Sequence, residues 1–196
     1  MKGQMYLLAA AILAAAISIY LATFKPVSID VGAETIQMQI ENSILENIVK
    51  EFKIAWACGY SNYTKMNEYV TDFGKYIKED MKSRSYDFNF LTISLTNNET
   101  ENTLTIFVSN FLGNDEEIAL NLNGTVKTLN LSDSSSEYTN FTSLSPENYI
   151  LNVSYENYTE TFNLNMNHTF YVIYSDLRVS TFNAYHRKVL KETYIV

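Results

Sequence analysis

Cysteine, histidine, proline and glycine are scarce in this chain of 196 residues, which contains one, two, two and six of them. The single cysteine, Cys58, excludes an intramolecular disulfide and a thiolate metal cluster. Positive charge is scarce as well, because 14 Lys and Arg stand against 22 Asp and Glu, for a net charge of -8. A nucleic-acid-binding surface must be basic, so this balance argues against nucleic acid as a partner.

Residues that carry chemistry are equally few. His168 and His186 have no metal-ligand spacing, and the sequence contains no phosphate-binding loop, nucleophile elbow or His-Glu-x-x-His motif. The acidic residues 114–117 are typical of a solvated turn, with weak calcium binding as the alternative. Cys58 follows an amphipathic segment and is expected to be buried, the alternatives being an intermolecular disulfide or acylation. We therefore predict no enzyme, no catalytic residue, no cofactor and no metal.

Charge is absent from residues 5–24, which form the longest apolar stretch. As a helix this stretch is about 30 Å long, the thickness of the hydrocarbon core of a bilayer. Tyr6 and Tyr20 lie near its ends, where aromatic rings favour the membrane interface. A cleaved secretory leader is the alternative, but its candidate exit, Ala14-Ala15-Ala16, lies inside the apolar stretch. We predict a retained transmembrane helix within residues 1–25.

Met1-Lys2-Gly3-Gln4 places a short basic segment and a glycine directly before this stretch. The arrangement resembles the class III signal peptide of archaeal type IV pilin-like proteins. The resemblance implies that a membrane peptidase cuts between Gly3 and Gln4 and leaves the hydrophobic helix on the mature protein. The sequence departs from the pilin pattern at Leu8, where pilins often carry a Glu that assists subunit registration, and at Tyr6, often Ser. An ordinary uncleaved signal anchor is the alternative.

Eight Asn-x-Ser/Thr sequences follow the apolar stretch, about twice the number that chance gives for this composition. This enrichment predicts N-linked glycans and a cell-surface location, with the N-terminus inside and the remainder outside. The acceptor residues are Asn62, Asn98, Asn123, Asn130, Asn140, Asn152, Asn157 and Asn167.

Apolar residues recur every three or four positions over residues 33–57 and again over 66–81, which predicts two amphipathic helices. Asn62 or Thr64 is the expected N-cap of the second helix. The short connection favours an antiparallel hairpin, and we assign residues 26–85 to a helical neck.

After Ser85 the apolar period changes to two, over about seven short segments without intervening helices. Asn123-Gly124 predicts a two-residue hairpin turn. Residues 86–196 are therefore expected to form an antiparallel β-sandwich of immunoglobulin-like class, and the whole chain to be α+β.

The stretch LSPENYILNVSYENYTETFNLNM resembles a hairpin of immunoglobulin-like and fibronectin-type surface modules. Leu144, Pro146 and Tyr149 occupy the positions of its Leu-x-Pro-x-x-Tyr turn. The resemblance implies that the Tyr149 hydroxyl binds the backbone upstream as a corner clamp. An ordinary buried tyrosine at a strand edge is equally compatible with the residues.

The pilin-like resemblance implies a structural or adhesive surface protein, anchored in the membrane or forming a homopolymeric filament through its N-terminal helix. The alternative is a monomeric anchored module that binds glycans or a partner protein. The basic residues His186, Arg187, Lys188 and Lys191 are expected to guard an edge strand, with contact to acidic partners or glycans as the lesser option.

Overall fold

The computed structural model of the chain describes residues 33–59, 62–98, 102–182 and 184–195. The chain divides into two compact units, residues 1–39 and 40–196, and the second contains every strand of the described residues. Two helices come first, α2 (Ala33–Gly59) and α3 (Tyr63–Ser83). Both helices match the predicted amphipathic segments.

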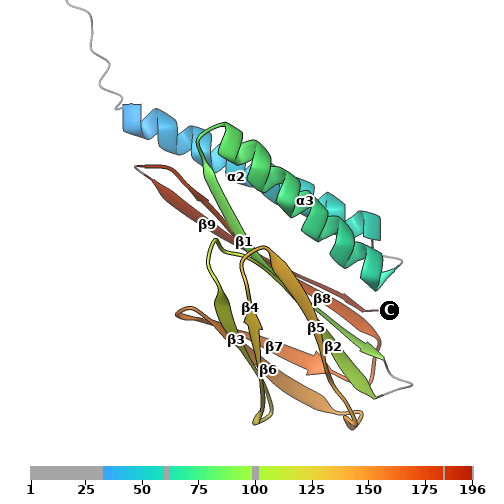
Figure 1. Cartoon of the computed structure of the whole chain (residues 1–196). Coiled ribbons are helices and arrows are strands. Elements are labelled where there is room, and N and C mark those ends of the chain that lie inside the picture. The colour runs from blue at the N-terminus through green and yellow to red at the C-terminus, as the bar shows by residue number, and fades with distance from the viewer. Residues whose placement is uncertain (1–32, 60–61, 99–101, 183, 196) are drawn as a thin grey trace, which may run out of the picture. The chain divides into compact units, whose positions relative to one another are not determined.

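Nine strands follow the helices (Figure 1) and form two antiparallel sheets. Sheet A has the order β5-β2-β1-β8-β9, and sheet B has the order β4-β3-β6-β7. The expected α+β fold with a β-sandwich is confirmed. The strands are β1 (Asp87–Asn98), β2 (Thr103–Phe111), β3 (Glu116–Leu122), β4 (Thr125–Leu131), β5 (Ser135–Phe141), β6 (Asn148–Tyr155), β7 (Tyr158–Asn165), β8 (Phe170–Ser180) and β9 (Tyr185–Ile195).

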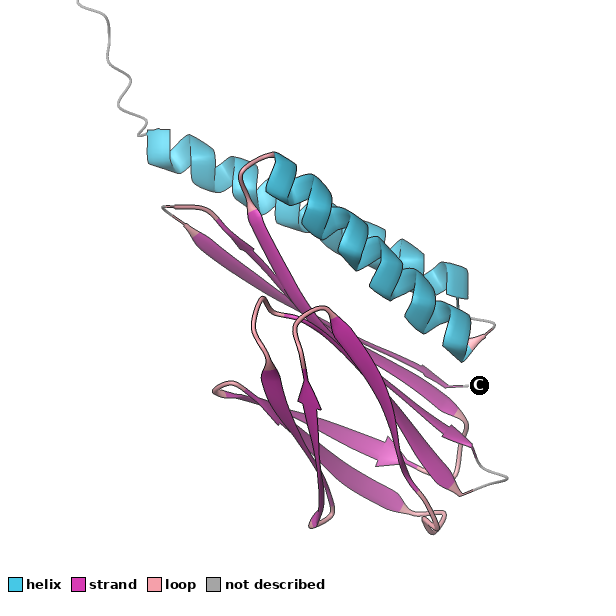
Figure 2. Cartoon of the chain, viewed as in Figure 1, coloured by secondary structure: helices cyan, strands magenta, loops and turns pink. Residues whose placement is uncertain are grey.

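Sheet A is covered on both faces, as Figure 2 shows, by sheet B on one side and by the helices on the other. Along β1, Leu91, Ile93 and Leu95 belong to the core between the sheets, whereas Phe88 and Phe90 belong to the core beneath the helices. Successive side chains of a strand point to opposite faces, so a strand between two layers needs apolar residues at both phases. β1 accordingly changes the phase of its apolar residues between Phe90 and Leu91.

Aromatic rings fill the core between the helices and sheet A. Phe52 of α2 is fully buried and meets Phe73 of α3 edge-on, with ring centroids 5.2 Å apart. Phe90 stacks on Phe111, with centroids 4.6 Å apart and planes 6° from parallel. Gly74 of α3 lies directly over Phe90, where a Cβ atom would come within 2.1 Å of the ring. Only glycine permits the helix to approach the sheet this closely.

Hydrogen bonds between polar side chains set the position of α3 on sheet A. Ser94 of β1 donates to the Asn67 side-chain oxygen over 2.6 Å, and the Tyr63 hydroxyl donates to the Ser94 carbonyl over 3.0 Å. Further along, the Thr71 and Ser109 hydroxyls lie 3.3 Å apart. Each of these groups is satisfied in this register, so sliding the helix would leave buried polar atoms unpaired.

Local signals define both ends of α3. Asn62, rather than Thr64, is the N-cap, and its Oδ1 accepts from the Lys65 N–H over 3.1 Å. At the other end, the Tyr86 N–H donates to the Met81 carbonyl and the Ser85 N–H to the Lys82 carbonyl. This is a Schellman motif, and Ser85 has the φ of 64° that usually selects glycine.

Two predicted turns are confirmed. Asn123 and Gly124 have φ values of 46° and 93° and join β3 to β4, as expected for a two-residue hairpin. The Tyr149 hydroxyl accepts a hydrogen bond from the Ser145 N–H over 2.9 Å, which is the predicted corner clamp. Tyr149 therefore does more than fill a strand edge.

One further expectation is wrong, and another concerns residues outside the described part of the chain. Cys58 was expected to be buried, but its side chain is exposed at the end of α2, one residue beyond the apolar stripe. The predicted transmembrane helix over residues 1–25 lies outside the described residues. None of the helices in the described part of the chain is both long and apolar enough to cross a bilayer.

Candidate functional site

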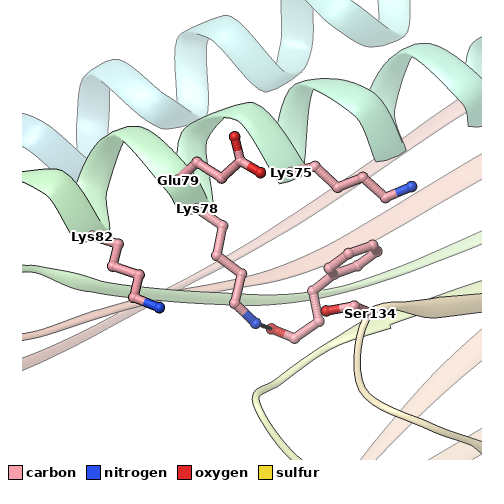
Figure 3. A pocket seen from close by; sticks show the side chains of 6 residues that line it. Lys75, Lys78, Glu79, Lys82 and Ser134 are labelled. Carbon is pink, nitrogen blue, oxygen red and sulfur yellow. Dashed lines mark hydrogen bonds between the residues drawn. The ribbon is translucent and has the colours of Figure 1, made fainter.

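A lysine-lined groove lies between α3 and the loop that joins β4 to β5. Lys75, Lys78 and Lys82 share one face of α3 because they are three and four residues apart. They reach over Phe111 toward Ser134 in the loop between β4 and β5, and enclose about 340 Å³ (Figure 3). Basic side chains thus gather at one place in an acidic protein.

Only one of these lysines is engaged by an acidic side chain. The Lys78 ammonium donates to the Phe111 carbonyl over 3.3 Å and lies 3.5 Å from the Asp133 carboxylate. Within the described residues, no carboxylate lies within ion-pair distance of Lys75 or Lys82. The Lys75 ammonium lies 5.8 Å from the centre of the Phe111 ring. Two of the three groove lysines therefore have no ion-pair partner among the described residues, and Glu79 adds one negative charge to the lining.

Asp133 stays ionised beside the groove. Partial burial alone would raise its pKa, but the Gly113 N–H, the charge of Lys78 and the Ser134 hydroxyl together hold the pKa of Asp133 below its ordinary value. A second cavity, of about 410 Å³, adjoins the groove and shares Lys78 and Lys82 with it. An extended anionic ligand would find room across both.

A buried ionic cluster lies between the two sheets, and its centre is Asp176 of β8, which is fully buried. Arg178 donates to Asp176 Oδ2 from NH2 over 2.7 Å, and Arg187 of β9 donates to Oδ1 from Nε over 2.8 Å. The Tyr155 hydroxyl donates to Oδ2 over 3.0 Å and accepts from Tyr174 over 2.6 Å. Every polar group at this centre has a partner.

Burial, together with the negative charge of Asp176 and the hydrogen bond that Tyr155 donates to it, raises the pKa of Tyr155 well above its ordinary value. The phenol therefore remains a neutral donor. Arg187 also stacks on the Tyr158 ring, 3.7 Å from its centre. A saturated network of this kind has no free group for catalysis, and we assign it a structural role that ties the β6–β7 turn to sheet A.

The basic residues of β9 form ion pairs with other parts of the protein. β9 is an edge strand of sheet A, as expected for its charged sequence. Lys188 pairs with Glu46 of α2 over 2.9 Å, and Lys191 pairs with Glu160 of β7 over 2.7 Å. These pairs connect the edge strand to both neighbouring layers, so this cluster does not form an open basic patch.

The acidic turn at residues 114–117 accepts hydrogen bonds from the backbone of two other loops. Asp115 accepts from the Asp133 N–H over 3.0 Å, and Glu116 accepts from the Glu156 N–H. Among the described residues, no group of three or more His, Cys, Asp or Glu side chains is placed to hold a metal ion.

Most predicted glycan acceptors are accessible. Asn152 is half-buried, and its oxygen accepts from the Thr161 hydroxyl over 2.8 Å. Asn98 ends β1. The processing residues Gly3 and Gln4 lie outside the described residues. The acceptors with exposed side chains are Asn62, Asn123, Asn130, Asn140, Asn157 and Asn167.

Sequence reasoning missed both the groove and the Asp176 cluster. The spacing of Lys75, Lys78 and Lys82 was a readable signal for one helix face, but the loop that closes the groove comes from another part of the chain. No known protein-family description matches this chain, and no curated protein sequence resembles it.

Proposed function

We propose that this chain is a membrane-anchored surface protein of pilin-like type, with a structural or adhesive role as an anchored subunit or a filament subunit. The observation that carries the proposal is the glycine at position 3 followed by the uncharged stretch 5–24. This stretch has the length of a bilayer-spanning helix, and its small residues permit close helix packing.

The second unit is suited to serve as the external head. The part of α2 from Ile40 onward shares its core with sheet A through Leu45, Val49 and Phe52. The part of α2 from Ile40 onward is therefore packed firmly on sheet A. Six of the eight glycan acceptors have exposed side chains, which is what N-glycosylation requires.

The finer fold class within this proposal is an immunoglobulin-like or fibronectin-type sandwich. Two features support it: the hairpin-connected strands β1 to β7 are divided between two sheets in Greek-key fashion, and Tyr149 forms the corner clamp. The strands β8 and β9 extend sheet A beyond this pattern. Such sandwiches recur in cell-surface proteins, which agrees with the proposed location.

Membrane fractionation tests the anchor. The full chain should stay with membranes through an alkaline carbonate wash and be released by detergent, whereas a variant lacking residues 5–24 should appear in the soluble fraction. Recovery of the full chain in the soluble fraction would refute the anchor. Electron microscopy of sheared surface material then separates a filament from a monomer. A filament should be lost on Ala14→Phe but retained on Lys65→Ala, an exposed control in α3.

A monomeric binding module is the second candidate, and the lysine groove favours it. Two lysines without acidic partners beside an apolar floor would suit a carboxylate-bearing glycan or an acidic peptide. An array of acidic and neutral glycans tests this function with the full chain in detergent. Binding that is selective for acidic glycans and is lost in Lys75→Gln/Lys82→Gln supports it, and binding unchanged by that double substitution refutes it.

A further inference from the structure

The hairpin between β8 and β9 carries an aromatic tip, made of Phe182 and Tyr185. The Phe182 side chain is 101% exposed and that of Tyr185 is 57% exposed. The Thr181 N–H donates to the Ala184 carbonyl over 2.9 Å and closes the turn. A phenylalanine ring left wholly in water gains nothing from the hydrophobic effect, so the tip offers apolar surface that burial outside the domain would stabilise.

Two ion pairs fix where this tip lies. Lys188 of β9 meets Glu46 of α2, and Glu192 meets Lys53. Four strand residues advance about 13 Å and seven helix residues advance about 10 Å, so β9 runs beside α2 in the same direction. The start of β9 therefore lies at the same end of the unit as Ile40, where the chain enters it (Figure 1).

The tip extends further in that direction than Ile40. Thr181 pairs with Ala184, so Phe182 lies at the turn, and the hairpin advances about 16 Å from Lys188 back to it, whereas α2 from Glu46 back to Ile40 advances only about 9 Å. The aromatic tip therefore extends beyond Ile40, at the end of the unit where the chain enters it.

We propose that the aromatic tip rests in the interfacial layer of the lipid bilayer that holds the N-terminal apolar stretch. This inference rests on the proposed membrane anchor. Residues 25–32 span at most about 28 Å and residues 33–39 of α2 rise about 10 Å, so the unit lies within about 40 Å of the end of the apolar stretch. Phenylalanine and tyrosine suit this layer because one ring is apolar and the other carries a hydroxyl that water can reach.

Apolar contact, rather than charge, drives this docking. The nearby cations are already engaged, since Arg187 binds Asp176 and Lys188 binds Glu46. The chain as a whole carries a net charge of -8, which gives no attraction to anionic lipids. Docking should therefore occur on zwitterionic phosphatidylcholine and should change little with salt.

A tryptophan placed at the tip tests the proposal in the full chain. Trp56 is the only native tryptophan and is first replaced by phenylalanine. Its buried indole N–H has no hydrogen-bond partner within the described residues, so Trp56→Phe breaks no hydrogen bond seen there. Phe182→Trp is then made in this background. Val126→Trp, at a site 59% exposed in β4 of the other sheet, is the matched control.

Both proteins are reconstituted in vesicles of phosphatidylcholine, with and without bromine atoms on the acyl chains. We expect the Phe182→Trp protein to emit at shorter wavelength than the Val126→Trp protein and to lose emission in brominated vesicles, while the Val126→Trp protein keeps its emission. Unquenched, long-wavelength emission from position 182 in protein that floats with the vesicles would overturn the docking and leave the anchor intact.

Two other outcomes also overturn the docking. Short-wavelength emission from position 182 without bromine quenching would mean that a second copy of the chain covers the tip. Protein that fails to float with the vesicles would refute the anchor, and the docking with it.

Discussion

Replacing Gly74 by alanine tests how closely α3 must approach sheet A. A Cβ at Gly74 would lie 2.1 Å from Phe90 Cζ and 2.7 Å from both Cε atoms. Ordinary carbon contacts are about 3.5 to 4.0 Å, so the gap must open by roughly 1.5 Å. The Phe90 ring has no free space to retreat into, because it is fully buried and stacked on Phe111.

Overpacking of this kind costs about 3 kcal/mol at the upper end of its usual range. Alanine is the better helix former and returns about 1 kcal/mol. The net expectation for Gly74→Ala is a loss of about 2 kcal/mol in the free energy of unfolding. Helix propensity alone predicts the opposite sign, so the direction of the change distinguishes the two effects.

Urea unfolding of the full chain in detergent measures this free energy, with Trp56 fluorescence as the signal. Trp56 is 1% exposed and belongs to the same core as Phe90, so its emission reports on the layer that is changed. The matched control is Gly74→Ala combined with Phe90→Leu, which removes the atoms that the new methyl group meets. The two substitutions should be strongly non-additive, with a coupling of about 2 kcal/mol. Additive effects, or a Gly74→Ala protein more stable than the wild type, would refute the close approach.

Four further predictions concern other parts of the fold. Asp176→Asn should lower the free energy of unfolding by about 3 kcal/mol, because it removes the fully buried carboxylate that Arg178 and Arg187 share; a change within error in urea unfolding would contradict the cluster's role. Tyr149→Phe should cost about 1 kcal/mol in the same assay through loss of the bond to Ser145, and an unaltered midpoint would mean that the corner clamp contributes nothing. Ser85→Gly should stabilise by about 1 kcal/mol, since glycine adopts a φ of 64° without strain, whereas a lower thermal midpoint would count against the Schellman geometry. Burial raises the pKa of Tyr63 and Tyr155, so these phenols ionise more readily in the unfolded chain. The free energy of unfolding should therefore fall as the pH rises above about 10. Absorbance at 295 nm that shows all tyrosines titrating before the protein unfolds would contradict this.

The parts of the fold predictable from sequence are those with strong local periodicity or distinctive turn residues. Both amphipathic helices, the Asn123-Gly124 turn and the Tyr149 clamp belong to this group. The strand β5 could not be found because only Phe141 is buried among its seven residues, and an edge strand needs little apolar alternation. In β9, likewise, only Leu190 is buried, and its charged residues act through partners distant in sequence.

The candidate sites depend on long-range contacts, which sequence periodicity does not report. Asp176 is one of several polar residues in β8, and its role appears only when Tyr155 and Arg187 lie beside it. The exposure of Cys58 escaped prediction for a related reason, since the helix surface covered by sheet A ends just before it. The glycan acceptors were readable as a motif, but their accessibility required the fold.

The intact mass of the protein extracted from its native membranes tests the central claim most directly, once glycans have been removed enzymatically. The account predicts a polypeptide that begins at Gln4 and retains the whole apolar stretch. A mass that begins at Met1 would contradict pilin-like processing, and a mass that begins after Ala16 would show that the stretch is removed rather than kept as an anchor.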